Sequence, residues 1–180
     1  MKFTAQIFLS AALLLGGALP AHAADPAPVP EIIRIKTGVD KPFTDEAGVK
    51  WRGDTGFTDG DTIERPDIAI ANTKTPSLYR AERYSITAFH WKLPKGKDTV
   101  KLHFCETYEE INAAGQRFFS FKVEGKEFKD FDVFKKAGGA LRAYIETVEV
   151  EVTDGSLDIL FTPQVENPQI NAHEIIPAML

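Results

Sequence analysis

The residues best suited to binding chemistry follow one predicted strand. Residues 99–107 begin with the alternation of a β-strand, and a polar loop then carries Glu106, Tyr108 and Glu109. A rigid strand that delivers an aromatic ring and carboxylates to a rim is a common way to build a ligand site. In the alternative interpretation, Tyr108 only covers the edge of the core and the glutamates are solvated.

Further aromatic residues on predicted loops extend this pattern. Phe57, Tyr79 and Tyr84 lie outside the clean strand alternation. A tyrosine offers a flat apolar face and a hydroxyl, which suits the apolar C–H face of a sugar ring, and a carboxylate accepts two hydroxyl protons at once. Tyrosines beside a carboxylate are therefore what a sugar site requires. The alternative is that Tyr79 and Tyr84 pack the ends of the sandwich.

Two carboxylates on loops are also what glycoside hydrolysis requires. Glu106 and Glu166 could meet, and the reaction needs one acid with a raised pKa and one that is ionised. A chain with 26 acidic residues contains some such pair by chance. Glu106 ends an apolar strand, where we expect it to satisfy the backbone or an arginine such as Arg83. A glycosidase is therefore the least favoured function.

Other chemistries have little support. The histidines are scattered without ligand spacing, and Asp54, Asp59 and Asp61 could hold calcium but suit turns better. The single cysteine, Cys105, is expected to be a small buried residue rather than a thiol activated by His103. There is no nucleophile elbow and no nucleotide-binding glycine loop. The sequence therefore predicts no catalytic residue, no cofactor and no metal.

The N-terminal residues predict export. Residues 1–23 have a basic start, an apolar stretch too short to span a membrane and an Ala-His-Ala cleavage site, as in a signal peptide. Residues 24–30 form a Pro/Ala linker, and residues 31–180 form a single domain. We expect a secreted or periplasmic protein without membrane insertion. Cleavage removes Lys2, which takes the net charge from −5 to about −6 and disfavours nucleic acid as a partner.

The elements that must position these residues are short strands. Alternation predicts strands over residues 31–36, 85–93, 99–107, 117–123, 128–134, 143–152, 156–161 and 170–176. Turns are predicted at residues 94–97 and 124–125, and a hairpin at Asp154–Gly155. No helical period is convincing, and residues 53–75 form a long loop that is expected to be functional or mobile. The pattern predicts an all-β jelly-roll β-sandwich with a phenylalanine-rich core.

Five ordered blocks resemble one known family. Residues 33–51, 78–84, 100–108, 115–126 and 167–175 are similar, in this order, to motifs of the malectin domain. The resemblance implies a galactose-binding-like jelly roll with binding loops at one end. It also implies non-catalytic binding of a glucose-containing oligosaccharide or polysaccharide.

The resemblance also implies particular site residues. The family's sugar-contacting tyrosines correspond to Tyr84 and Tyr108, and its acid corresponds to Glu166, where animal malectin has the shorter Asp. An aromatic position of the family is occupied by Glu109, and another aromatic position corresponds to Phe57, which lacks a hydroxyl. Malectin-like domains also occur in receptor ectodomains, so the alternative is a protein-interaction module with a decayed sugar site and a protein partner.

Overall fold

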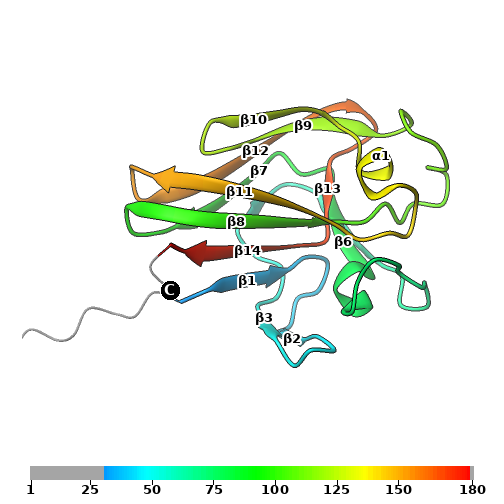
Figure 1. The fold of residues 1–180 in the computed structure, drawn as a ribbon, viewed down its shortest axis with the longest axis horizontal. Helices are drawn as coiled ribbons and strands as arrows, with labels where there is room; N and C mark the ends of the chain where they lie inside the picture. Colours follow the sequence, from blue (N-terminus) through cyan, green and yellow to red (C-terminus); the bar gives the residue numbers. More distant parts are fainter. Residues whose placement is uncertain (1–30, 179–180) are drawn as a thin grey trace, which may run out of the picture.

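The computed structural model describes residues 31–178, in which two antiparallel sheets form the main layers (Figure 1). One sheet has four strands, in the order β1 (Ile33–Lys36), β14 (Ala172–Pro177), β8 (Gly96–Phe104) and β11 (Tyr144–Val152). The other has five strands, in the order β10 (Lys126–Phe131), β9 (Phe118–Val123), β12 (Ser156–Val165), β7 (Ala88–Lys92) and β4 (Phe57–Thr58). The fold is the all-β jelly-roll sandwich that the sequence predicts. The predicted signal peptide and linker lie outside the described residues.

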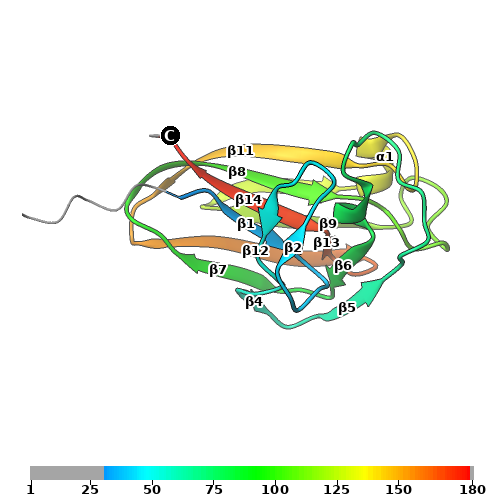
Figure 2. The ribbon, with the colours of Figure 1, turned by 90° about the horizontal axis from the view of Figure 1, so that it is seen from below.

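Smaller elements gather around the sandwich. A three-stranded sheet at one end has the order β13 (Gln169–Ile170), β6 (Ala81–Tyr84) and β5 (Asp61–Glu64). Figure 2 shows that this end also carries α1 (Val133–Ala137). The remaining elements are the 3₁₀ turn η1 (Pro76–Tyr79) and the short pair β2 (Phe43–Thr44) and β3 (Lys50–Trp51). No helix within residues 31–178 is long and apolar enough to cross a membrane.

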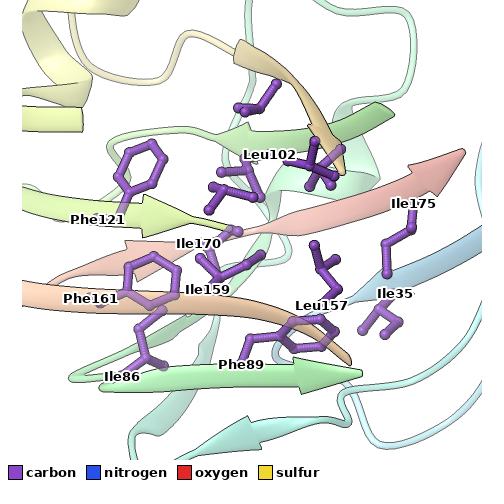
Figure 3. Close-up of a cluster of buried hydrophobic side chains, with 14 of the residues drawn as sticks. Ile35, Ile86, Phe89, Leu102, Phe121, Leu157, Ile159, Phe161, Ile170 and Ile175 are labelled. Atoms are coloured by element: carbon purple, nitrogen blue, oxygen red, sulfur yellow. The ribbon is translucent and has the colours of Figure 1, made fainter. Parts of the chain in front are cut away.

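The core lies between the two sheets and follows from the alternation of side chains. On β11 the valines at 148, 150 and 152 are buried while Glu149 and Glu151 are exposed. Figure 3 shows Leu102 and Ile175 of one sheet and Phe121, Leu157 and Phe161 of the other within one buried cluster. Aromatic rings fill much of this space, as the phenylalanine-rich composition predicts.

A second apolar cluster covers the outer face of the four-stranded sheet near the end of β8. It contains Trp51, Ile70, Leu78, Tyr79, Cys105 and Ala172. Tyr79 is only 2% exposed, and its hydroxyl lies 2.9 Å from Nδ1 of His103. Cys105 is fully buried, and burial raises the pKa of its thiol to about 12, which agrees with the prediction of a packing role.

Several predicted elements differ from the structure. Asp154–Gly155 does not form a hairpin, because it joins β11 of one sheet to β12 of the other. The strand predicted over residues 128–134 stops at Phe131, and α1 follows. The Asp132 carboxylate accepts a hydrogen bond from the Lys135 N–H and so begins this helix, and Gly138, with a φ of 76°, ends it.

Candidate functional site

Loops and strand ends at the three-stranded end of the sandwich form an open pocket of about 290 Å³. It is defined by the lining residues Ile63, Arg65, Glu82, Tyr84, Tyr108, Arg117, Glu166 and Asn167. We call it the tyrosine pocket. Three of the predicted site residues, Tyr84, Tyr108 and Glu166, therefore line one cavity although they come from distant parts of the chain.

Tyr84 is held by the strand that carries it. It is the last residue of β6, where it pairs with Asp61 of β5 and Gln169 of β13. The preceding Arg83 points the other way and binds the Asp54 carboxylate, with Nε 2.9 Å from Oδ2. Arg83 also donates to the carbonyl oxygen of Gly60, at 2.9 Å. These contacts fix β6 against the loop before β5.

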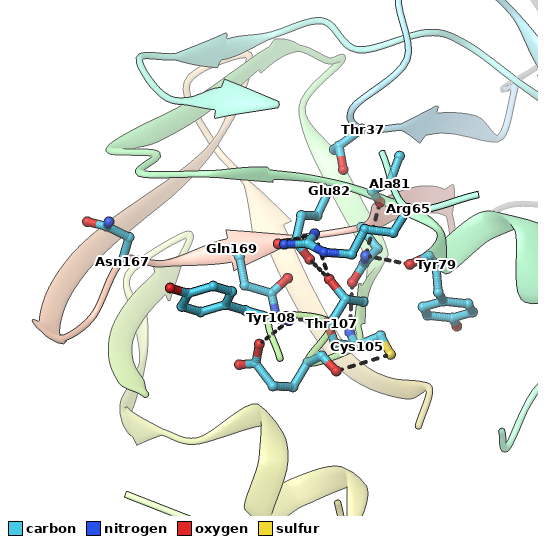
Figure 4. A network of polar contacts seen from close by, with 12 residues as sticks. Thr37, Arg65, Tyr79, Ala81, Glu82, Cys105, Thr107, Tyr108, Asn167 and Gln169 are labelled. Carbon is cyan, nitrogen blue, oxygen red and sulfur yellow. Dashed lines mark hydrogen bonds and ion pairs between the residues drawn. The ribbon is translucent and has the colours of Figure 1, made fainter. Parts of the chain in front are cut away.

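A polar network supports the segment that leads to Tyr108. The Thr107 hydroxyl donates to Glu82 at 2.6 Å and accepts from Arg65 at 3.0 Å, and Arg65 also pairs with Glu82 at 3.3 Å. Figure 4 shows these three side chains in contact, with the Tyr108 ring beside them. Because Glu82 is 3% exposed and bonded on both sides, the segment has little freedom to move.

Beneath Tyr108 lies a buried ion pair. Glu106 is 1% exposed, and its Oε2 is 3.0 Å from Nε of Arg117, whose side chain is 6% exposed. The two atoms are not aligned for a hydrogen bond, so their attraction is electrostatic. The other oxygen, Oε1, accepts the Tyr108 N–H at 3.0 Å. Burial raises the pKa of Glu106 to about 7, against the lowering effects of Arg117 and the Tyr108 N–H.

The opposite wall is the turn after β12. Glu166 has a φ of 58°, in the left-handed region, and its side chain is exposed at the rim. Arg117 donates to the carbonyl oxygen of Asn167 at 3.1 Å, and the Ser85 N–H donates to the carbonyl oxygen of Pro168 at 2.9 Å. The turn is therefore tied to both β6 and the start of β9.

An apolar groove of about 810 Å³ adjoins the tyrosine pocket and shares Ile63, Arg65 and Tyr108 with it. Its further lining residues are Ile68, Glu106, Thr107, Glu109, Ile111, Asn112, Phe134, Ala140 and Leu141. Glu109 is exposed and faces this groove rather than the tyrosine pocket. The two cavities together form a cleft with a polar part and an aliphatic part.

Two other predicted site residues do not line the tyrosine pocket. Tyr79 was expected on a loop at the rim, but it is buried against the outer face of the four-stranded sheet. Phe57 lies on β4, with its ring 5.0 Å from Phe89 and 5.5 Å from His173, measured between centroids. Both aromatic rings therefore pack into the fold.

The expected role of Glu106 is confirmed, because its carboxylate accepts the Tyr108 backbone N–H and pairs with an arginine. That arginine is Arg117, whereas Arg83, the example considered from the sequence, pairs with Asp54. Glu106 and Glu166 consequently differ in environment, since one carboxylate is buried in an ion pair and the other is exposed.

Sequence reasoning missed three polar residues of the pocket: Arg65, Glu82 and Arg117. Arg65 follows an exposed strand without alternation, and Arg117 precedes a strand that was recognised by its phenylalanines. The available signal was Glu82, a carboxylate within the Leu78–Tyr84 block, because a charge that is buried beside apolar neighbours such as Leu78 and Ala81 requires a partner.

The aspartates considered for calcium have other partners. Asp54 binds Arg83 and the Gly38 N–H, the latter at 2.9 Å, and Asp59 accepts the Thr87 hydroxyl at 2.9 Å. Within residues 31–178, no group of three or more His, Cys, Asp or Glu side chains is arranged to hold a metal ion.

The amino-acid sequence is similar to that of known protein domains. The family model of the malectin domain matches residues 31–176. A probable leucine-rich repeat receptor-like serine/threonine-protein kinase of Arabidopsis thaliana is 38% identical over 102 residues, which cover 52% of this chain and 10% of the kinase. The chain thus spans about a tenth of the length of this curated relative.

Solved structures share the fold. A β-glucuronidase of Bacteroides uniformis superposes with a TM-score of 0.74 at 17% identity, over 82% of this chain and 18% of the other. A chain in the structure of the plant peptide RALF23 in complex with FER and LLG2 gives a TM-score of 0.69 at 16% identity, over 81% of this chain and 48% of the other. At these identities the likeness concerns the fold alone.

Proposed function

Because the family model covers most of its length, the chain belongs to the malectin-domain family, and we propose that it is an exported, non-catalytic carbohydrate-binding module. Its ligand is a glucose-containing oligosaccharide or polysaccharide held in the tyrosine pocket. The observation that carries this proposal is the position of Tyr84, Tyr108 and Glu166 around one open cavity. The predicted signal peptide supports a secreted or periplasmic location.

The lining of the tyrosine pocket suits a neutral sugar. Tyr84 and Tyr108 are half-buried, so each ring can offer an apolar face while it stays accessible. The exposed Glu166 carboxylate can accept hydroxyl protons, and such charge-assisted hydrogen bonds are the stronger kind. A cavity of about 290 Å³ is at the small end of ligand sites, so it suits one or two sugar rings. Modest affinity follows, because few contacts are desolvated.

Isothermal titration calorimetry with glucose-based disaccharides and glucans tests this function. The double variant Tyr84→Ala, Tyr108→Ala is expected to lose binding. Tyr144→Phe is the matched control, since Tyr144 is a half-buried tyrosine that bonds Glu146 and does not line the pocket. Unchanged affinity in the double variant contradicts the proposed site. Aryl glucoside turnover that disappears in Glu106→Gln contradicts the non-catalytic role.

A second candidate function is the binding of a protein or peptide. The aliphatic side chains of Ile68, Ile111 and Leu141 in the apolar groove suit a partner's apolar side chain better than a sugar ring. The relative's receptor-like character and the peptide complex among the similar structures support this reading. Capture of a secreted partner that survives excess oligosaccharide and is lost in Leu141→Glu favours this function over the first.

A further inference from the structure

Arg117 contacts both walls of the tyrosine pocket. Its guanidinium carbon lies 5.9 Å from the centroid of the Tyr108 ring, within the range of a cation–π contact. The same guanidinium donates to the carbonyl oxygen of Asn167 on the opposite wall, at 3.1 Å. One cation from the start of β9 thus connects the segment after β8 to the turn after β12.

Glu106 holds this cation from below without lining the tyrosine pocket. Its Oε2 lies 3.0 Å from Nε of Arg117, and its Oε1 accepts the Tyr108 N–H. The Glu106 carbonyl oxygen also accepts the Leu141 N–H at 2.9 Å. The side chain therefore fixes the Tyr108 backbone directly and the Asn167 turn through Arg117.

We propose that Glu106 is a positioning residue, whose ionised carboxylate couples the two walls of the tyrosine pocket through Arg117 and thereby makes ligand binding depend on pH. This inference rests on the proposed function of the tyrosine pocket as a sugar site. It goes beyond that function because it assigns the control of pocket geometry to a residue that does not line the tyrosine pocket.

The ionisation of Glu106 falls in a useful pH range. Burial raises the pKa of its carboxyl to about 7. The charged groups that face it are Arg117, Arg65 and Glu82, of which the arginines favour the ionised form and Glu82 opposes it. Above pH 7 the carboxylate balances the buried Arg117 cation. Below pH 7 the protonated acid leaves that cation without a counter-charge, so the guanidinium is expected to shift toward solvent.

The ionisation of Glu106 predicts how ligand affinity changes with pH. We expect ligand affinity to fall about tenfold between pH 8 and pH 5, which corresponds to a Glu106 pKa that is about one unit lower in the bound protein than in the free protein. Among residues 31–178, no histidine lines the tyrosine pocket, so we attribute the expected pH dependence to Glu106. The variant Glu106→Gln keeps an acceptor for the Tyr108 N–H but has no charge, and its affinity is expected to be low and independent of pH.

Calorimetry of the full chain at pH 5, 6, 7 and 8 provides the test, with the wild type, Glu106→Gln and the control Glu174→Gln. Glu174 pairs with Arg34 at 2.9 Å and lies outside the pocket lining, so its loss tests for general destabilisation. The control is expected to keep the wild-type profile. A Glu106→Gln profile that still falls at low pH overturns the inference, as does a flat profile in the wild type.

A readout without ligand separates this inference from the proposed function. In the free wild type, NMR is expected to show the Tyr108 amide shift and the Asn167 carbonyl carbon shift changing together, with a midpoint near pH 7. If only Tyr108 responds, the coupling through Arg117 is wrong. If the coupled titration is present but no sugar binds at any pH, the proposed function fails while the coupling of the two walls through Glu106 stands. The titration also decides the question if Glu106→Gln does not fold.

Discussion

The side-chain oxygen of Asn171 accepts a hydrogen bond from the backbone N–H of Cys105 at 2.7 Å. The amide nitrogen of Asn171 donates to the carbonyl oxygens of Tyr79 and Ala81, at 3.2 and 3.0 Å. One fully buried amide therefore joins the end of β8, which leads to Tyr108, to the start of β6, which leads to Tyr84. The relative position of the two tyrosines depends on this residue.

Replacement of Asn171 by alanine is expected to lower the free energy of unfolding by about 3 kcal/mol. The change leaves the Cys105 N–H and the Tyr79 carbonyl oxygen buried without their partner, and each such group costs about 1–3 kcal/mol. The Ala81 carbonyl oxygen keeps the hydrogen bond from the Lys36 ammonium. Urea unfolding followed by circular dichroism measures the loss. Asn112→Ala, at an exposed position, is the control and is expected to stay within about 0.5 kcal/mol of the wild type. Equal stabilities of the two variants would contradict the role of Asn171.

Gly60→Ala is expected to be more damaging than Gly48→Ala, although both glycines have positive φ values, of 90° and 77°. An added Cβ at Gly60 would lie 2.4 Å from the Tyr84 carbonyl oxygen, whereas nothing lies within 4 Å of one at Gly48. Backbone strain alone costs about 1–2 kcal/mol, and the clash adds to it. Thermal unfolding of both variants compares the costs. Because the clash is with β6, only Gly60→Ala should also weaken ligand binding.

Lys36 is expected to make stability rise with alkaline pH. It is 1% exposed, its ammonium donates to the carbonyl oxygens of Thr37 and Ala81, both at 2.8 Å, and burial lowers its pKa to about 7. Between pH 7 and its ordinary pKa near 10.5, the unfolded chain holds this proton and the folded chain releases it. The free energy of unfolding therefore increases as the pH rises through this window.

The variants Lys36→Met and Lys41→Met test that expectation. Urea unfolding at pH 7, 8 and 9 should show a rise of a few kcal/mol in the wild type, since each pKa unit corresponds to about 1.4 kcal/mol. The rise should be lost in Lys36→Met and kept in Lys41→Met, because Lys41 is exposed. An identical slope in all three proteins would show that Lys36 stays protonated in the fold.

The tyrosine pocket is expected to prefer neutral glucosides over glucuronides. At pH 8, where Glu106 is ionised, Arg65 and Arg117 are balanced by Glu82 and Glu106, whereas Glu166 has no ion-pair partner within the described part of the chain. A uronate would meet this uncompensated carboxylate. We expect a preference of a few fold at low salt, which corresponds to less than about 1 kcal/mol. Calorimetry with a glucose disaccharide and its uronic acid counterpart measures it, and Glu166→Gln should reduce it. A tighter-binding uronate contradicts this charge assignment.

The sandwich could be predicted because its strands alternate strictly. Val148, Val150 and Val152 show which face of a strand is buried, and the structure agrees. Alternation does not show which strand is the neighbour. Asp154–Gly155 is a typical hairpin sequence, yet here it crosses between the sheets, since β11 completes the edge beside β8. Local turn chemistry cannot distinguish these two paths.

The candidate site was only partly predictable. Tyr108 follows a predicted strand that was expected to reach a rim, whereas Tyr84 was identified through the resemblance to the malectin domain, and both line the tyrosine pocket. Tyr79 does not reach the rim, because η1 packs over the four-stranded sheet. There the Tyr79 side chain lies beside His103 and Trp51. Arg117 and Glu106 are 11 positions apart in the sequence, and their contact depends on how β8 and β9 stack in different sheets. Contacts between side chains of different sheets produce no regular spacing of residues, so a single sequence does not reveal them.

The antiparallel pairing of β1 and β14 has a practical consequence. Ile33 lies opposite Ile175, and Pro177 lies opposite Asp98 near the start of β8, while the tyrosine pocket lies beyond the end of β8. The two ends of the described chain, at residues 31 and 178, thus lie at the end of the sandwich that is remote from the tyrosine pocket. A tether or fused reporter attached at either of these ends would leave the tyrosine pocket facing away from the attachment point. The domain can therefore be immobilised on a sensor chip with the pocket accessible to ligand.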